Sequence, residues 1–115
     1  MRLSEAVDRA DAIRPNPILI EEKRNWLRQL ESDIAEMMET DLPEWTMTDD
    51  PELLLPEPKD YLYPLYLLPY IDLWLEETDL YQLDIIQANQ SITEIKAWWR
   101  RNNRSQKKQY KGVFQ

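Results

Sequence analysis

The chain has 115 residues and a hydrophobic fraction of 43%, which suits one folded domain and leaves no room for a second core. It contains no cysteine and no histidine, so disulfides, thiolate metal sites and a catalytic histidine or cysteine are excluded. The single glycine, Gly112, lies near the end, which disfavours a β-rich fold with its several tight turns. An all-α fold is therefore expected.

The net charge of −8 is distributed unevenly along the chain. Residues 31–90 carry sixteen acidic side chains against one basic side chain, whereas residues 91–115 carry seven basic side chains against one acidic side chain. Such an acidic body repels phosphates, so the domain as a whole is not expected to bind DNA. The acidic block equally fits a purely solubilising role. The basic end can bind phosphate or an acidic surface, including that of another copy.

Two helices are predicted before residue 40. The first spans Ser4 to Ile13, with Ser4 as its cap and an apolar stripe along one side. Asn16 followed by Pro17 predicts the start of a second helix, which runs from about 18 to 39. Its seam consists of Ile20, Lys23, Leu27, Leu30, Ile34 and Met37, with Lys23 as the only polar member. A helix about 30 Å long predicts an elongated molecule.

A proline-rich loop is predicted over residues 41–58, which contain four prolines and no helical period. Loops of this length are usually functional or mobile. This one is unusually apolar because it carries Trp45, Met47 and Leu53. The loop is therefore predicted to dock onto a partner through these three side chains.

The acidic residues of this loop do not form a recognisable metal site. Asp49, Asp50 and Glu52 lack the alternating ligands, central glycine and final glutamate of a calcium-binding loop. A chain with one glycine also has no glycine-rich phosphate loop. The sequence thus predicts no catalytic residue, no metal and no cofactor, and an enzyme is the least favoured class.

Two further helices are expected after the loop. Residues 59–76 are apolar on nearly every side, which predicts a helix buried by the fold or by partners, with a kink or break at Pro64 and Pro69. The last helix is predicted to begin at Thr78 or Asp79, with Asp79 as its cap. Its seam consists of Tyr81, Ile85, Ala88, Ile92, Ile95 and Trp99. The matching seams predict that it packs antiparallel along the second helix.

A basic C-terminal arm, residues 104–115, follows a single helical domain over residues 1–103. The arm is predicted to bind a partner through its basic and aromatic side chains, which are Arg104, Lys107, Lys108, Tyr110, Lys111 and Phe114. The predicted fold is an elongated all-α bundle of three to four helices with one long proline-rich loop and a basic tail. No membrane contact is expected, because the longest apolar stretch is about ten residues and a span needs about 20. The charged N-terminus does not resemble a signal peptide, so a soluble protein is expected.

Several spaced residues, taken in order, resemble a known family. They are Leu3-Ser4-Glu5-Ala6, Asp8-Arg9, Arg14-Pro15-Asn16, Lys23, Trp26-Leu27, Leu30-Glu31, Leu54-Leu55-Pro56, Pro58, Asp60, Leu62-Tyr63, Tyr66-Leu67, Ile71-Asp72, Asp79, Tyr81 and Trp98-Trp99-Arg100-Arg101-Asn102-Asn103. This order, over about residues 3–103, resembles small head–tail connector (adaptor) proteins of long-tailed phages of Gram-positive bacteria. The chain departs from the family pattern at Pro64 and Pro69 and at Glu76-Glu77-Thr78-Asp79, where relatives carry an Asn-Gly-Glu-like turn.

The resemblance implies a structural subunit of the virion rather than an enzyme. It implies an all-α homo-oligomer, a ring of about twelve copies beneath the portal protein, built in the host cytoplasm and located at the head–tail junction. Such a ring contacts a downstream tail or head-completion protein. It also continues the channel through which genomic DNA passes without sequence-specific binding. No catalytic residues carry over.

Two other classes of function stay open from the sequence. A small acidic inhibitor that imitates DNA would explain the acidic block, but not the basic arm. A single-strand nucleic-acid binder could stack bases on Trp98 and Trp99 and hold phosphates with the arm. For this tryptophan pair, packing in the core is the favoured interpretation over stacking on bases.

Overall fold

The structure is a computed structural model that describes residues 1–46 and 48–103. Its elements in chain order are α1 (Leu3–Ile13), α2 (Ile20–Met38), a short 3-10 helix η1 (Lys59–Tyr61), α3 (Leu62–Trp74) and α4 (Thr78–Asn102). Within the described ranges no β-strand occurs, only an isolated bridge between Arg2 and Glu52. The predicted all-α fold is confirmed.

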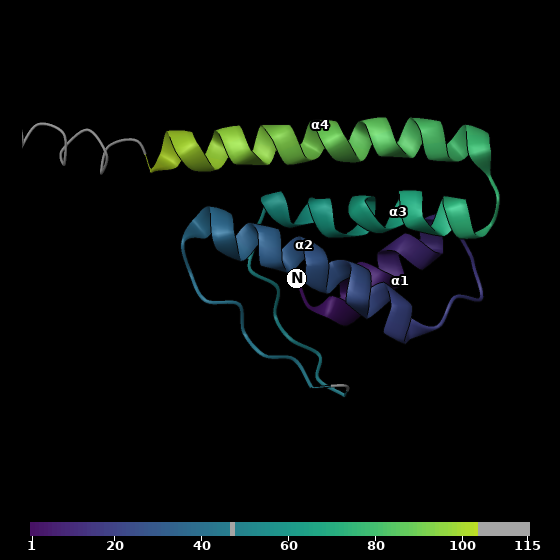
Figure 1. Ribbon diagram of the computed structural model, residues 1–115, viewed down its shortest axis with the longest axis horizontal. Helices are drawn as coiled ribbons and strands as arrows, with labels where there is room; N and C mark the ends of the chain where they lie inside the picture. Colours follow the sequence, from purple (N-terminus) through teal and green to yellow (C-terminus); the bar gives the residue numbers. More distant parts are fainter. Residues whose placement is uncertain (47, 104–115) are drawn as a thin grey trace, which may run out of the picture.

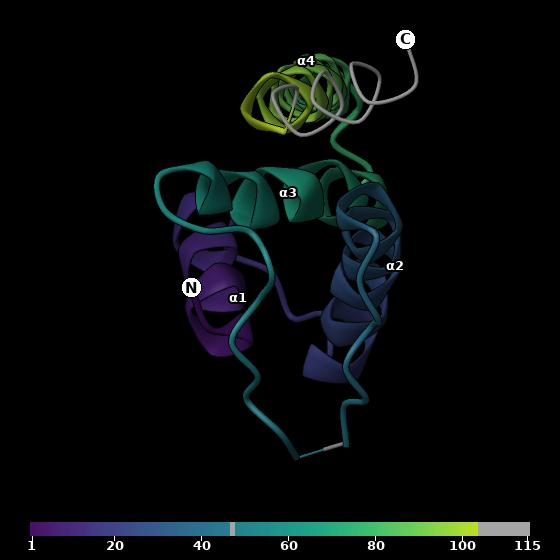
Figure 2. The same cartoon turned by 90° about the vertical axis from the view of Figure 1, so that its left-hand side faces the viewer.

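The helices form three layers with α3 in the middle (Figures 1 and 2). Helix α4 lies along one side of α3, and α1 and α2 lie on the other side. This position explains why α3 is apolar on nearly every side, since neighbours cover it from two directions. The molecule measures 57 × 33 × 19 Å and its radius of gyration is 16.2 Å, against roughly 13 Å for a compact domain of this size. The predicted elongated shape is confirmed.

The core is built mainly from α1, α2 and α3, together with the end of the long loop. Its fully buried apolar members include Leu3, Ala6, Val7 and Ala10 of α1, Leu27, Leu30 and Ile34 of α2, Leu62, Tyr63, Leu67, Leu68 and Ile71 of α3, Leu53 and Leu55 of the loop, and Ile95 of α4. Helix α4 is the longest element and contributes least to this cluster. It packs instead against α3, in the most extensive contact between two helices of the described structure.

The predicted packing of the last helix along the second helix is wrong. Helix α4 packs along α3, and α2 packs against α3 as well. The predicted seams of α2 and α4 are apolar as expected, but both face α3, the more apolar helix that lies between them. Because α3 has apolar side chains all round, it takes the central position.

The predicted helix caps are also wrong, because Ser4 bonds to a distant residue, Asn16 bonds within a connection, and Asp79 makes no capping hydrogen bond. Helix α1 begins after Arg2, and Ser4 lies inside it, donating its N–H and its hydroxyl to the Asp50 carboxylate at 2.8 and 2.7 Å. Asn16 caps no helix, since α2 begins at Ile20. Its side-chain oxygen instead accepts from the N–H of Ile18 at 3.0 Å within the α1–α2 connection. Helix α4 begins after Glu77, without a side-chain cap from Asp79.

The predicted helix after the loop is present, and of the two alternatives predicted at Pro64 and Pro69, a kink or a break, the break does not occur. Pro64 lies in the first turn, where backbone N–H groups have no partner within the helix. Pro69 lies inside α3, which continues to Trp74. Pro69 itself is buried between the neighbouring helices, and this packing offsets the lost backbone hydrogen bond.

The turn between α3 and α4 ends α3 with a left-handed residue. Glu76 has a φ of 61°; its N–H donates to Leu73 O at 3.2 Å, and the N–H of Glu77 donates to Asp72 O at 2.9 Å. This is the hydrogen-bond pattern of a Schellman motif, which usually has glycine at the left-handed position. Helix α2 ends similarly at Glu39, with a φ of 55°. A chain almost without glycine thus ends two helices with glutamate.

Candidate protein-binding site

The structure places two of the three loop residues that were predicted to contact a partner. Trp45 is half-buried, packs against the core and lies under the guanidinium of Arg28, which is 5.4 Å from the ring centre. Leu53 is only 4% exposed and belongs to the core of its own subunit, so it is not available at a docking surface. Met47 and the arm residues 104–115 lie outside the described residues.

The acidic part of the loop is held in place by α1 and α2. Arg24 donates to the backbone oxygens of Thr46 and Asp49, both at 2.6 Å. Hydrogen bonds from Ser4 lower the pKa of the Asp50 carboxyl, and hydrogen bonds from Thr46 lower that of Asp49. These carboxylates therefore have structural partners. No group of three potential ligand side chains in the described part of the chain could hold a metal ion.

A buried hydrogen-bond network fixes the end of the loop to the core. The Tyr63 hydroxyl donates to one oxygen of the Glu31 carboxylate, and the N–H of Leu54 donates to the other at 2.9 Å. The N–H of Leu55 donates to the Tyr63 hydroxyl at 2.8 Å. Burial raises the pKa of Glu31, and burial together with the Glu31 charge raises that of Tyr63. The sequence analysis did not identify Glu31 as a member of this network. The one feature of the sequence that points to it is its position directly after Leu30 of the apolar seam.

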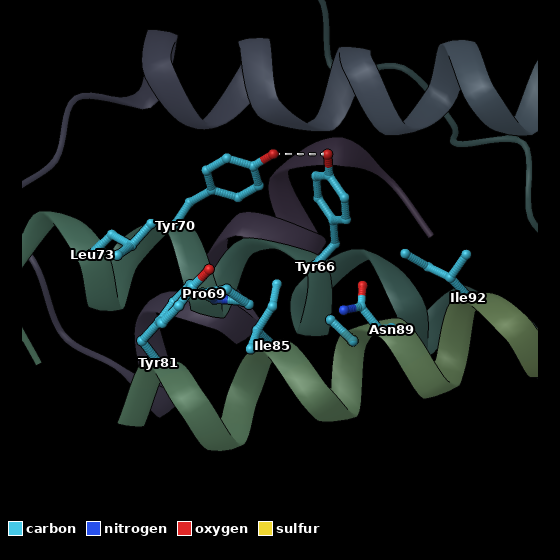
Figure 3. A pocket seen from close by; sticks show the side chains of 9 residues that line it. Tyr66, Pro69, Tyr70, Leu73, Tyr81, Ile85, Asn89 and Ile92 are labelled. Atoms are coloured by element: carbon cyan, nitrogen blue, oxygen red, sulfur yellow. Dashed lines mark hydrogen bonds between the residues drawn. The ribbon is translucent and has the colours of Figure 1, made fainter. Parts of the chain in front are cut away.

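An apolar groove lies between α3 and α4 and is called here the α3–α4 groove (Figure 3). It holds about 250 Å³ and is lined by Tyr66, Pro69, Tyr70, Leu73, Tyr81, Ile85, Ala88, Asn89 and Ile92. The hydroxyls of Tyr66 and Tyr70 lie 3.1 Å apart on the side towards α2. Trp26 of α2 stacks on Tyr70, with ring centres 4.9 Å apart. The α3 wall of the groove is thus aromatic, and Trp26 supports it from the side of α2.

The groove continues towards the other end of α3 as a smaller hollow. Tyr66 and Ile92 line both, and α2 contributes Leu30, Ile34 and Met37 to the second. Asp33 and Lys96 are the charged side chains of this hollow. The two together form an apolar track over α3, between α2 and α4.

The two ends of the track carry opposite charge. The end at the α3–α4 turn has the exposed acids Glu76, Glu77 and Asp79, which form no ion pair within the described residues. The opposite end, near the C-terminus of α4, has the exposed bases Lys96, Arg100 and Arg101, which outnumber the exposed acid Asp33 of α2 in the same hollow. A segment that enters the groove therefore meets acidic groups at one end and basic groups at the other.

An ion-pair cluster ties α4 to the body near the acidic end. Arg14 of the α1–α2 connection donates to Asp72 of α3 at 2.8 Å and to Asp84 of α4 at 2.7 Å. Asp72 is fully buried, and its second oxygen has no hydrogen-bond partner in the described structure. Burial, and secondly the neighbouring Asp84 carboxylate, raise the pKa of Asp72 to about 6.

This cluster predicts a pH-dependent stability. The folded pKa of Asp72 is raised above its ordinary value of 3.8 to about 6, so its stabilising contribution is present at low pH and is lost as pH rises through about 6. Asp72→Asn keeps an oxygen for Arg14 but cannot ionise. We expect the change in Tm between about pH 5 and pH 7.5 to be smaller in this variant than in the parent. Asp8→Asn, at an exposed site on α1, is the control and should keep the parent's profile; identical profiles for all three proteins would contradict the assignment.

The tryptophan pair at the end of α4 packs rather than projecting into solvent. Trp98 contacts the core, with the Lys59 ammonium 5.6 Å from its ring centre. Trp98 and Trp99 meet edge to face at 6.0 Å, and both are half-buried. This geometry favours the core interpretation over a platform for stacked bases.

The fold and the groove define an all-α protein with an apolar track over α3 whose two ends differ in charge. Comparison with models of known protein families finds no match. Searches of curated proteins and of solved structures also find no significant relative. None of the described helices is both long enough and apolar enough to cross a membrane.

Proposed function

We propose that this chain is a structural head–tail connector subunit of a phage neck, without enzymatic activity. In this proposal about twelve copies form a ring beneath the portal protein. The ring contacts a downstream tail or head-completion protein and lets genomic DNA pass through its channel. The subunit would be located in the virion at the head–tail junction, after assembly in the host cytoplasm.

The observation that carries the proposal is that the residues behind the family resemblance contact one another in space. Arg14 and Asp72 form an ion pair although they are 58 positions apart. Glu31, Tyr63 and the Leu54-Leu55 pair belong to one buried hydrogen-bond network. Residues scattered along the sequence by chance would have no reason to share buried polar contacts. Their interlocking supports reading the resemblance as the signature of one fold.

The surface charge also supports a channel role. Twelve of the sixteen acidic residues between 31 and 90 are exposed. An acidic wall repels phosphates, which lets DNA pass without adhering. A DNA-imitating inhibitor would share this charge, but it has no need for an apolar track between two helices.

The test is assembly of the full chain with the portal protein of the same phage, followed by negative-stain electron microscopy. We expect an added ring at one end of the portal, in register with the portal's symmetry. Portal alone, and portal with an unrelated acidic helical protein, serve as controls. Portal particles that stay unchanged at saturating concentrations of the chain would refute the proposal. A chain that instead stays monomeric and blocks a DNA-binding enzyme would be an inhibitor.

A further inference from the structure

We infer that the α3–α4 groove binds the C-terminal arm, residues 104–115, of a second copy, which enters at the α3–α4 turn. This inference rests on the proposed ring and names the contact between neighbouring subunits. It follows from the apolar lining of the groove, from the order of charged and apolar residues in the arm, and from the opposite charges at the two ends of the track.

The groove matches the apolar end of the arm in length and chemistry. From Tyr81 to Ile92, α4 rises about 16 Å at 1.5 Å per residue. Tyr110, Val113 and Phe114 of the arm span about 13 Å when extended. The lining is almost entirely aromatic and aliphatic, and Leu73 at its mouth is 57% exposed. An apolar face of this kind is stabilised when side chains of similar character cover it.

The direction of entry follows from charge. Along the arm the bases Arg104, Lys107 and Lys108 precede the apolar residues Tyr110, Val113 and Phe114, and a fourth base, Lys111, lies among these apolar residues. An arm that enters at the α3–α4 turn places its apolar end in the groove and its bases beside Glu76, Glu77 and Asp79. Entry at the other end would place these bases beside Lys96, Arg100 and Arg101 instead, where like charges repel.

The same argument disfavours binding of a subunit's own arm. Helix α4 ends at Asn102, at the far end of the molecule from the α3–α4 turn (Figure 1). To enter its own groove, the arm would have to reverse direction at once and run its bases past Arg100 and Arg101. When two copies are placed head to tail, the arm of one copy reaches the acidic end of the other copy's track directly. Such a contact is heterologous, and repeated around a closing rotation it gives a ring.

The absence of cysteine from the chain allows a direct test by disulfide crosslinking. One full-length variant carries Phe114→Cys. The other carries Asn89→Cys, at an exposed groove position (Figure 3), together with a tag that changes its size. The two are mixed with and without portal protein, oxidised and separated on non-reducing gels. We expect the mixed disulfide at least tenfold above that formed with Asp8→Cys, an exposed position on α1.

A second experiment reverses the charge at the acidic end of the track. Glu76→Lys with Glu77→Lys in the Asn89→Cys chain should lower the mixed disulfide severalfold at low salt and flatten its salt dependence. Lys107→Glu with Lys108→Glu in the Phe114→Cys chain should restore it. Circular dichroism of each variant checks that the helices are intact. If the lysine substitutions lower the mixed disulfide and the glutamate substitutions in the arm do not restore it, the arm does not enter at the acidic end.

Other outcomes separate this inference from the proposed function. If the Phe114→Cys, Asn89→Cys double variant crosslinks mainly within one chain at high dilution, the groove binds its own arm and the inference fails. If no mixed disulfide exceeds the control even with portal present, the inference fails although the ring on the portal can still be seen. A strong mixed disulfide without any binding to portal would support the inference and refute the connector function.

Discussion

Replacing Ile95 with aspartate is expected to lower the free energy of unfolding by about 3–5 kcal/mol. Ile95 is 1% exposed and is the member of α4 that enters the hydrophobic core. A carboxylate at this position would be buried without a partner. Because Ile95 is the fully buried side chain of α4 in this core, the substitution should weaken the packing of α4 on α3.

A matched substitution on the same helix separates burial from helix propensity. Ile86 is 56% exposed, so Ile86→Asp makes the same chemical change without burying a charge. We expect it to alter the free energy of unfolding by no more than about 0.5 kcal/mol. Urea denaturation followed by circular dichroism measures both. Similar values for the two variants would show that α4 is not held through Ile95.

The helices could be predicted from the sequence, but their partners could not. An apolar seam shows that a helix has a face to bury, as the seams of α2 and α4 do. It does not show which neighbour covers that face. The signal that would have resolved the arrangement was the composition of residues 59–76, since a helix that is apolar all round belongs between two others.

The predicted caps failed for a related reason. Ser4 and Asn16 have the right residue types for capping, and local rules treat them as helix starts. In the fold, Asp50 reaches Ser4 from 46 residues away, and Asn16 uses its side chain to shape a connection. Tertiary contacts of this range cannot be read from a local pattern.

The binding site was only partly predictable. Apolar loop residues were expected at a docking surface, yet Leu53 is in the core; apolar character alone does not tell core from interface. The groove depends on Tyr66, Tyr70 and Tyr81 facing one space from two helices, which requires the packing of α3 on α4. The spacing of Tyr66 and Tyr70 placed them on one helix face, but gave no indication of what that face borders.

Removing the Tyr63 hydroxyl is expected to destabilise the protein by about 2–4 kcal/mol at neutral pH. Tyr63→Phe leaves the buried Glu31 carboxylate without one of its two donors and leaves the N–H of Leu55 without its acceptor. Tyr70→Phe removes a half-buried hydroxyl whose one hydrogen-bond partner among residues 1–46 and 48–103 is Tyr66. This control should cost at most about 1 kcal/mol.

The loss of stability in Tyr63→Phe should depend on pH, and the pKa of Glu31 determines the direction of this dependence. Burial already raises this pKa, and the hydrogen bond from Tyr63 lowers it in part, so the Phe variant raises it further. A carboxyl with a raised folded pKa stabilises the fold below its unfolded value of 4.5 and loses that contribution as pH rises. Tyr63→Phe should therefore cost more at about pH 7.5 than at about pH 4.5.

A double-mutant cycle tests whether the two side chains act as a pair. Glu31→Leu removes the buried charge, so adding Tyr63→Phe to it leaves no carboxylate unsatisfied. We expect the double variant to be less destabilised than the sum of the single variants by at least about 1 kcal/mol, because each single change orphans a group that the double change removes. Urea denaturation at both pH values measures the cycle. Additive losses with no pH dependence would mean that Glu31 and Tyr63 are packed side by side without an energetic coupling, and that other contacts hold the end of the loop, such as the N–H of Leu53 donating to Met1 O and the burial of Leu53 and Leu55.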